Sequence, residues 1–179
     1  MGIAKPFNLQ KWIKENKELL QPPVSNKNLY VESDDYIVMI VGGPNARKDY
    51  HYNETEELFY QLKGEITVYI QEDGQKKAMK LSEGDMYLHP AKVPHSPART
   101  EGSVGLVIER KRAGKGFNDG LLWFCDNCNH KLHEVYFELH NIEKDFLPHF
   151  QDFYNSEEKR TCKQCGTVME TNPKFTIKK

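Results

Sequence analysis

The hydrophobic positions follow different patterns in different parts of the chain. Near the N-terminus, five of them stand close to the spacing of one helical face: Leu9, Trp12, Ile13, Leu19 and Leu20. Asn8 precedes them as a plausible N-cap, and the Pro-Pro pair at 22–23 is a stop signal. The pattern therefore predicts one amphipathic helix at the start of the chain.

The middle of the chain, from "NLYVES" to Arg112, changes to short runs rich in Val, Ile, Tyr and Phe. Turn-forming stretches such as "GGPN", "EDGQ" and "SEGD" separate these runs, which is typical of successive strands. The clearest pair is "EITVYIQ" and "KKAMKLS", joined at Asp73-Gly74, because Asp-Gly suits the positive φ angles of a tight hairpin turn. Regularly spaced strands of this kind predict a β-sandwich or a small barrel.

A second region begins after Arg112, where "AGKGFNDG" has the composition of a flexible connection. It contains a strand-like "HKLHEVYFELH" and a short helical stretch around "NIEKDFLPHFQDFY", which Pro148 is expected to interrupt. We therefore divide the chain into residues 1–112, with the helix and the β region, and residues 113–179, a smaller C-terminal segment that packs on the barrel.

Composition narrows the class of partners. The 179 residues carry a formal net charge of -1 and have a pI of about 6.7, so no broad electrostatic field favours nucleic acid or an anionic membrane. No apolar run approaches the roughly 20 residues that cross a bilayer, and the N-terminus lacks the apolar core of a signal peptide. We expect a cytoplasmic protein without nucleic-acid or membrane partners.

Three residues of the β region are the candidate ligands of a first metal site: His51, Glu57 and His95. The alternation along "EELFYQL" turns Glu57 inward and leaves Glu56 as a solvated neighbour. Two imidazoles and one carboxylate on one face suit Fe(II) and leave positions open for substrate and oxygen. Taken singly, each residue has the alternative of an ordinary surface or turn position, and His89 is interpreted as structural.

The four cysteines of the chain stand in two Cys-x-x-Cys pairs, at Cys125, Cys128, Cys162 and Cys165. Two such pairs supply four thiolates in tetrahedral geometry, as structural zinc sites and rubredoxin-type iron sites require. These residues alone do not distinguish iron from zinc. The alternatives to a metal site are a redox-active cysteine pair or reduced cysteines in the core. His130 and His133 lie nearby but are surplus to four thiolates.

Two stretches of the β region resemble the motifs of the cupin family. "GGPNARKDYHYNETEELFYQLKG" resembles the first motif, with Gly64 seven residues after Glu57, and "GDMYLHPAKVPH" resembles the second. Asn53 stands where the first motif usually has a second His, and Lys92 replaces a Gly of the second. The resemblance implies a mainly β cupin fold, a double-stranded β-helix or jelly-roll barrel, with a three-ligand metal site.

A closer resemblance covers almost the whole chain. "PFNLQKWI", "IVMIVGGPNARKDYH", "EELFYQLKG", "HSPAR", "LVIERKR" and the two cysteine pairs together resemble the 3-hydroxyanthranilate 3,4-dioxygenase family, in the form with a C-terminal rubredoxin-like site. The resemblance implies a homodimeric enzyme that uses O2 to open the ring of 3-hydroxyanthranilate. The product would be 2-amino-3-carboxymuconate semialdehyde, on the kynurenine route to quinolinate and NAD.

The same resemblance assigns roles to single residues. It implies that His51, Glu57 and His95 bind the catalytic Fe(II), and that a second iron occupies the four-cysteine site. Arg47 matches the residue near dioxygen, and Arg99 and Glu109 match those that hold the substrate, with Glu57 close to it. Four residues match the pocket wall with less support, because such side chains are often simply core: Val24, Asn26, Phe59 and Pro97.

Other functions stay open from the residues alone. The cupin fold also carries other metalloenzymes and catalytically silent proteins that bind a small acid, because fold does not fix reaction. Arg47, Arg99 and Glu109 could instead form salt bridges at a rim. A zinc ribbon that touches nucleic acid is a weaker alternative, because the basic "KFTIKK" segment is short.

Overall fold

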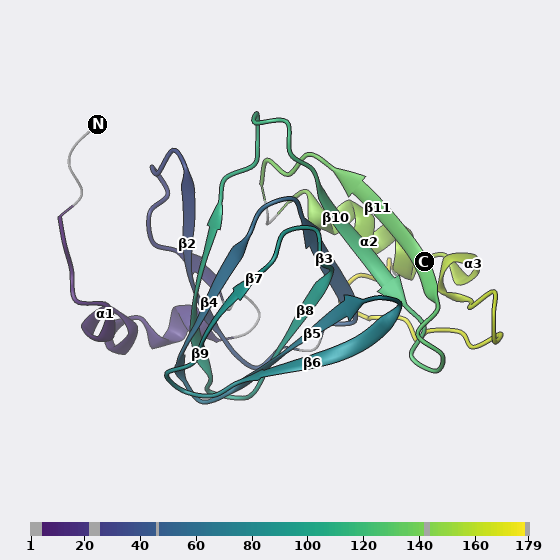
Figure 1. Ribbon diagram of the computed structural model, residues 1–179, viewed down its shortest axis with the longest axis horizontal. Coiled ribbons are helices and arrows are strands. Elements are labelled where there is room, and N and C mark those ends of the chain that lie inside the picture. Colours follow the sequence, from purple (N-terminus) through teal and green to yellow (C-terminus); the bar gives the residue numbers. More distant parts are fainter. Residues whose placement is uncertain (1–4, 22–25, 46, 142–143, 178–179) are drawn as a thin grey trace.

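The computed structural model describes residues 5–21, 26–45, 47–141 and 144–177. These residues form two antiparallel sheets, with helices at the two ends of the chain (Figure 1). Sheet A has the strand order β1 (Asn26–Asn28), β2 (Tyr36–Gly42), β9 (Val104–Arg110), β4 (Glu57–Lys63) and β7 (Met86–His89). Sheet B has the order β11 (Lys131–Phe137), β10 (Asp119–Phe124), β3 (Asp49–Asn53), β8 (His95–Arg99), β5 (Ile66–Glu72) and β6 (Gln75–Leu81).

The two sheets face each other across one hydrophobic core. Sheet A contributes Met39, Phe59 and Val107, and sheet B contributes Ile66, Val68, Ile70 and Leu81. The chain crosses between the sheets several times, for example from β4 in sheet A to β5 in sheet B. This is the jelly-roll arrangement of a cupin, so the predicted fold class is confirmed.

The predicted hairpin is present as β5 and β6. Glu72 pairs with Gln75, and the turn residues Asp73 and Gly74 have φ angles of 53° and 73°. These values lie in the left-handed region that a tight hairpin turn requires, which explains the Asp-Gly sequence.

The N-terminal segment covers part of the outer face of sheet A. Its predicted helix is present as α1 (Leu9–Glu15) followed by a 3₁₀ turn, η1 (Lys17–Leu20), and Asn8 caps α1 by accepting a 2.8 Å hydrogen bond from the Lys11 backbone N–H. Leu20 packs with Ile40 and Val104 of the sheet, and side chains of α1 border this cluster. In this segment η1 buries Leu20, whereas α1 has no fully buried residue and lies at the side of the barrel (Figure 1).

The C-terminal segment extends sheet B. β10 pairs with β3, and β11 pairs with β10, so the boundary expected near residue 113 lies in the connection between β9 and β10. Two helices follow, α2 (Phe146–Tyr154) and α3 (Glu157–Arg160). The expected interruption at Pro148 is wrong, because this residue occupies the first turn of α2, where a backbone N–H has no helical partner to lose.

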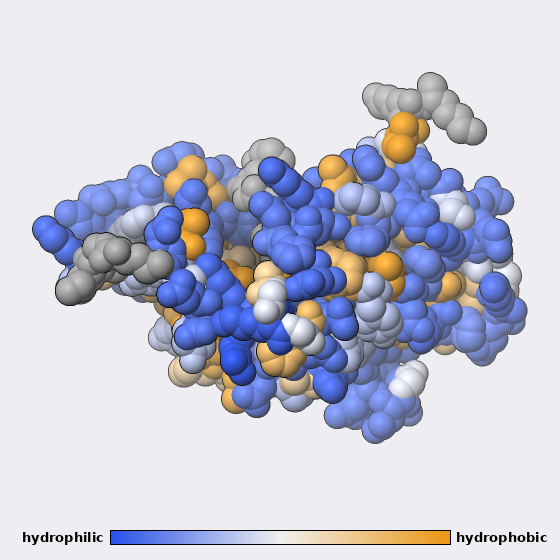
Figure 2. Space-filling view, turned by 90° about the horizontal axis from the view of Figure 1, so that it is seen from above, coloured by the Kyte–Doolittle hydropathy of each residue, from blue (hydrophilic) through white to orange (hydrophobic). Residues whose placement is uncertain are grey.

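The C-terminal helices have a core of their own against sheet B. It combines Leu121 and Trp123 of β10 with residues of α2 and of the chain that follows: Phe146, Phe150, Phe153, Tyr154 and Met169. Figure 1 shows these elements beside β10 and β11. No helix in the described ranges combines the length and hydropathy needed to span a membrane, and Figure 2 shows a mainly hydrophilic face with small separate hydrophobic patches.

Candidate active site

The three predicted metal ligands lie together inside the barrel. His51 comes from β3, Glu57 from β4 and His95 from β8, and their ligand atoms all lie within 4.8 Å of one another. All three side chains are buried, and His95 Nε2 is 3.1 Å from Glu57 Oε2. Strand geometry explains the grouping: His51 pairs directly with His95, and the alternation of β4 turns Glu57 inward while Glu56 is exposed.

The donor set suits a metal ion. Two imidazoles and one carboxylate are the ligands of Fe(II) oxygenase sites with open coordination positions. Burial alone would raise the pKa of Glu57, but the adjacent His95 and His51 outweigh burial and lower this pKa to about 2. Glu57 is thus ionised at neutral pH, which coordination to a cation requires.

Asn53 stands where the first cupin motif usually has a second histidine, and it contacts Glu57. Its side-chain N–H donates a 3.1 Å hydrogen bond to Glu57 Oε2. The residue is buried in β3, two positions after His51. Asn53 therefore supports the carboxylate ligand from the position where the motif would place another ligand.

His89 is buried, but both of its ring nitrogens have protein partners. Nε2 donates to the Val93 carbonyl at 2.8 Å, and Nδ1 accepts from the Tyr87 hydroxyl at 3.1 Å. Burial, followed by the charge of His95, lowers the pKa of His89 to about 4. A neutral ring with two fixed partners fits the structural role expected for this residue.

Arg99 is a buried cation that lacks a carboxylate partner among the described residues. Its side chain reaches into the barrel from β8, and its Nη1 has no hydrogen-bond partner. Burial is the main cause that lowers its pKa to about 10, and Arg47 adds to this effect while Glu57 opposes it. Because a buried, unpaired guanidinium is costly, this site fits an anionic ligand.

Gly105 has no side chain, and this leaves space beside the Arg99 guanidinium. It lies on β9, and a Cβ there would be 2.8 Å from Arg99 Nη1 and 3.1 Å from Gln61 Oε1. Gln61 is buried, and its Oε1 also lacks a partner. A side chain at position 105 would therefore press on the unpaired Nη1 end of Arg99.

Glu109 lies opposite Glu57 on the neighbouring strand and is buried. Burial, followed by the charge of Glu57, raises the pKa of Glu109 to about 7, although Arg112 opposes this shift. Arg112 Nη1 donates a 2.8 Å hydrogen bond to Glu109 Oε2. Arg47, in contrast, is one third exposed and forms an ion pair with Asp49 of β3.

Sequence reasoning missed the polar residues that surround these groups. Asp49, Arg112 and Asp119 are buried and hydrogen-bonded around the candidate site. Arg112 directly precedes the "AGKGFNDG" stretch and Asp119 lies within it. The Gly-rich composition of this stretch indicates a loop and carries no signal for a buried ion pair. The only sequence signal for these residues is a charged side chain close to the end of a predicted strand.

The predicted pocket-wall residues lie in different places. The Phe59 ring is 5.9 Å from the His95 ring, and Pro97 lies between His95 and Arg99 on β8. Asn26 lies on the edge strand β1, and Val24 is outside the described residues. The structure thus places Phe59 beside a candidate ligand.

The four cysteines come together in a second cluster. Cys125 Sγ lies 3.6 Å from Cys165 Sγ, Cys128 Sγ lies 3.5 Å from Cys162 Sγ, and none is in a disulfide. Each pair sits in a tight turn of the same kind, in which the backbone N–H of the residue after the second cysteine donates to the carbonyl of the first cysteine. His130 and His133 are not members of this cluster. Four thiolates at such distances suit a tetrahedral metal ion.

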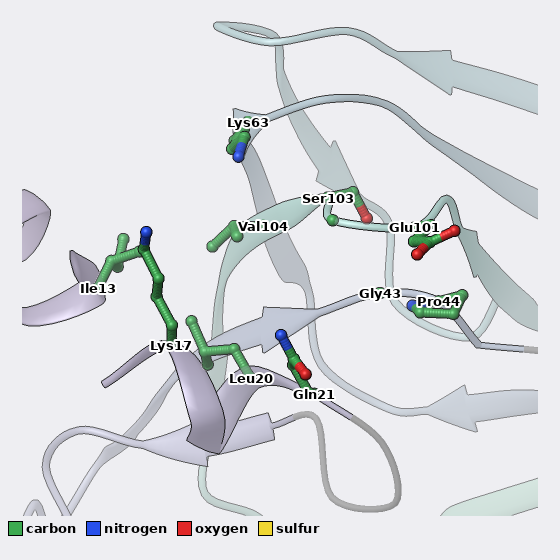
Figure 3. Close-up of a pocket in the computed structure, with 11 residues that line it drawn as sticks. Ile13, Lys17, Leu20, Gln21, Gly43, Pro44, Lys63, Glu101, Ser103 and Val104 are labelled. Carbon is green, nitrogen blue, oxygen red and sulfur yellow. The ribbon is translucent and has the colours of Figure 1, made fainter. Parts of the chain in front are cut away.

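A cavity of about 350 Å³ lies outside the barrel interior. Figure 3 shows it between η1, with Lys17 and Leu20, the following Gln21, and the chain around Gly43 and Ser103. None of the predicted ligands or substrate-binding residues lines it. The chemistry described above is therefore separate from this cavity.

Comparisons with known proteins give the family of the chain. The family model described as 3-hydroxyanthranilic acid dioxygenase matches residues 1–154. A 3-hydroxyanthranilate 3,4-dioxygenase of Xanthomonas campestris pv. campestris (strain B100) is 51% identical over 166 residues, which are 93% of each chain. That of Bacillus thuringiensis (strain Al Hakam) is 49% identical over 164 residues, which are 91% of this chain and 90% of the relative. Among solved structures, a cupin-2 domain containing protein from Shewanella frigidimarina covers 57% of this chain and 99% of its own, at 21% identity and a TM-score of 0.45. By the family match and these identities, the chain belongs to the 3-hydroxyanthranilate 3,4-dioxygenase family.

Proposed function

We propose that this protein opens the ring of 3-hydroxyanthranilate with O2 and releases 2-amino-3-carboxymuconate semialdehyde. The bond that breaks joins the hydroxyl-bearing ring carbon to its unsubstituted neighbour. One oxygen atom completes a carboxylate on the first carbon, and the other forms the aldehyde on the second. The observation that carries this proposal is the buried His51, Glu57 and His95 cluster, with the unpaired Arg99 on the same strand as His95.

We propose Fe(II) as the metal of this cluster. The two imidazoles and one carboxylate fit it, and an oxygenase that needs open coordination positions favours it over zinc. Fe(II), when bound, offers those positions to the substrate and O2 and exchanges electron density with them. Side chains of the protein bind and orient the substrate and exchange protons with it.

Arg99 is proposed to bind the substrate carboxylate. Its planar fork can donate two parallel hydrogen bonds to a carboxylate, which fixes the orientation of the ring as well as adding binding energy. Its buried and unpaired Nη1 supports this role. With the carboxylate held there, the amine and hydroxyl on the adjacent ring carbons turn toward the cluster.

Glu109 and Arg47 are proposed to act on the reacting end of the substrate. Glu109 Oε2 accepts from Arg112, which leaves Oε1 to accept a hydrogen bond or a proton from the substrate. A pKa near 7 suits a group that exchanges a proton near neutral pH. Arg47, which the Asp49 ion pair holds, would stabilise negative charge that develops on dioxygen.

The four-cysteine cluster is proposed to hold a second iron, or zinc, in a structural role. A shell of four thiolates has no place for substrate. We keep residues 1–112 as the catalytic part and residues 113–179 as the part that holds this metal. Thiols without disulfides also support a reducing, cytoplasmic location.

A homodimer is proposed through the outer face of sheet A. Strand pairing aligns Leu88, Leu58, Ile108 and Val38 in one apolar row across four strands, and Met86 and Tyr60 stand in the next row. Leu88 and Met86 are 55% and 65% exposed. Apolar rows of this kind can pack against the same rows of a second copy, as a two-fold interface between identical chains requires.

Turnover on a defined metal tests the proposed reaction. Metal-free protein is loaded with Fe(II) without oxygen, then mixed with 3-hydroxyanthranilate, and then exposed to air. We expect the strongly absorbing semialdehyde to form with one O2 consumed for each substrate molecule. Protein that holds iron and binds the substrate, yet takes up no oxygen, would instead be a non-catalytic small-acid binder.

A further inference from the structure

A continuous buried network connects the candidate metal ligand His51 with the candidate substrate contact Glu109. His51 Nε2 donates a 2.7 Å hydrogen bond to Asp119 Oδ1. Arg112 holds the same carboxylate with two donors, Nε to Oδ2 at 2.9 Å and Nη2 to Oδ1 at 2.7 Å. A third donor of this guanidinium, Nη1, lies 2.8 Å from Glu109 Oε2.

All members of this network are removed from solvent. Asp119 has no exposed surface, and Arg112, Glu109 and His51 are 3%, 3% and 7% exposed. Arg112 Nη1 also donates to Thr55 Oγ1 and to the Arg110 carbonyl. A buried ion network is costly unless every charge has partners, and here every charged group has at least one.

The two ends of the network come from different strands. His51 lies on β3, Asp119 is the first residue of β10, and Glu109 lies near the end of β9. Arg112 stands in the connection between β9 and β10, which runs from one sheet to the other. The network therefore fixes sheet A to sheet B at the depth of the candidate metal site.

The hydrogen bond to Asp119 also constrains the chemistry of the imidazole. Because a carboxylate can only accept, the His51 nitrogen that faces Asp119 carries the proton. The other ring nitrogen then keeps its lone pair, which is the one that can bind a cation. Asp119 thus sets both the tautomer and the orientation of the ring.

We propose that Asp119 and Arg112 are positioning residues of the active site, in which Arg112 acts through Asp119 on His51 and directly on Glu109. The proposal rests on the function proposed above, because it assigns His51 to the metal and Glu109 to the substrate. Arg112 then bridges the two ends, because it bonds to Asp119 behind the metal ligand His51 and to the substrate contact Glu109. Replacing it should disturb both ends together.

Metal affinity in the absence of substrate tests the first half of this proposal. The probe is Mn(II) followed by electron paramagnetic resonance, because Mn(II) favours carboxylate and imidazole ligands and disfavours a thiolate site. Asp119→Asn keeps the shape of the side chain and lowers its basicity. We expect this variant to bind Mn(II) roughly 10–100 times more weakly, as loss of an outer partner of a ligating histidine usually does.

Arg112→Lys tests the route through Asp119, because lysine keeps the charge and loses the two-donor fork. We expect Mn(II) affinity to fall in this variant as well, and the double variant Asp119→Asn/Arg112→Lys to be no worse than Asp119→Asn alone. Residues that act in series give such non-additive changes, whereas independent structural effects add. Arg112→Lys alone should also weaken 3-hydroxyanthranilate binding to the Mn(II) form.

Asp35→Asn is the matched control for Asp119→Asn. Asp35 is exposed and accepts a 2.7 Å hydrogen bond from Lys115, so it anchors the same connection without touching the network. Its Mn(II) affinity should equal that of the unchanged protein. Thermal midpoints of all variants are measured alongside, so that a general loss of stability can be separated from a loss of metal.

The outcomes separate this proposal from the proposed function. If the unchanged protein binds no Mn(II), the metal site itself is wrong. If it binds Mn(II) and the two variants bind it equally well, the positioning roles are overturned and the network is only structural. Additive losses in the double variant would overturn the route from Arg112 through Asp119.

Discussion

The charged and metal-ligating residues inside the barrel differ in how far the sequence predicts them. His51, Glu57 and His95 were predictable because strand alternation and motif spacing place donors on one face. Arg112 and Asp119 were not, because loop composition says nothing about which charged side chains will turn inward. A buried pair in a connection depends on the fold around it, which no local pattern encodes.

Arg99 allows a prediction at this scale. Arg99→Lys keeps the charge but loses one of two hydrogen bonds to the substrate carboxylate, each worth roughly 1.5–3 kcal/mol when charged groups are involved. We expect kcat/KM for 3-hydroxyanthranilate to fall roughly 10- to 150-fold, mainly through KM. Steady-state kinetics of oxygen uptake measure this.

Two further variants give this prediction its controls. Gly105→Ala introduces a Cβ 2.8 Å from Arg99 Nη1 and should also raise KM, although it touches no substrate. Arg110→Lys makes the same exchange one residue after Glu109, at an exposed position whose guanidinium lies over the Phe117 ring. The kcat/KM of Arg110→Lys should be unchanged. An equal fall in kcat/KM would mean that the effect of Arg99→Lys does not depend on a specific contact between Arg99 and the substrate.

Elements were predictable where a local signal fixes them. The Asp73-Gly74 turn and the Asn8 cap are encoded within a few residues, and both are present. The helix at Pro148 was misjudged because proline breaks a helix only past its first turn, and the sequence does not state where that turn begins. The pairing of β10 with β3 joins residues far apart in the chain, which periodicity cannot reveal.

The cysteine turns allow a prediction at the scale of elements. They lie at the end of β10 and in the chain after α3, so a metal bound by all four thiols would join two segments that pack beside sheet B. Cys125→Ser should remove one metal per chain and destabilise the fold by more than about 3 kcal/mol, since structural metal sites bind with roughly 10–16 kcal/mol. Metal analysis and chemical unfolding measure both effects.

The same variant should keep its iron at the histidine cluster and retain turnover at low temperature. His130→Asn is the control, because this exposed side chain lies beside the turn but outside the cluster of thiols. It should change neither metal content nor stability. Loss of turnover in folded Cys125→Ser protein, with the catalytic iron present, would contradict a structural role for the four thiols.

At the scale of the whole molecule, the helices at the two ends of the chain cover different faces of the barrel. α2 and its neighbours pack against Leu121 and Trp123 of β10, on the same face of sheet B as His51, because Leu121 pairs with His51. The N-terminal segment covers the outer face of sheet A around Ile40 and Val104. The rest of this outer face keeps large apolar side chains in solvent, including Tyr36, Met86 and Leu88.

This exposed face leads to a prediction about assembly. Leu88→Glu places a charge at the β7 end of the apolar row formed with Leu58 and Ile108, and burying it against a second copy without a partner would be costly. We expect the unchanged protein to sediment as a dimer and this variant as a monomer with its iron site intact. Met79→Glu is the control, because Met79 is an exposed apolar residue on β6 of the other sheet. If Leu88→Glu remains dimeric, or if Met79→Glu dissociates equally, the interface lies elsewhere and the exposed rows of sheet A need another explanation.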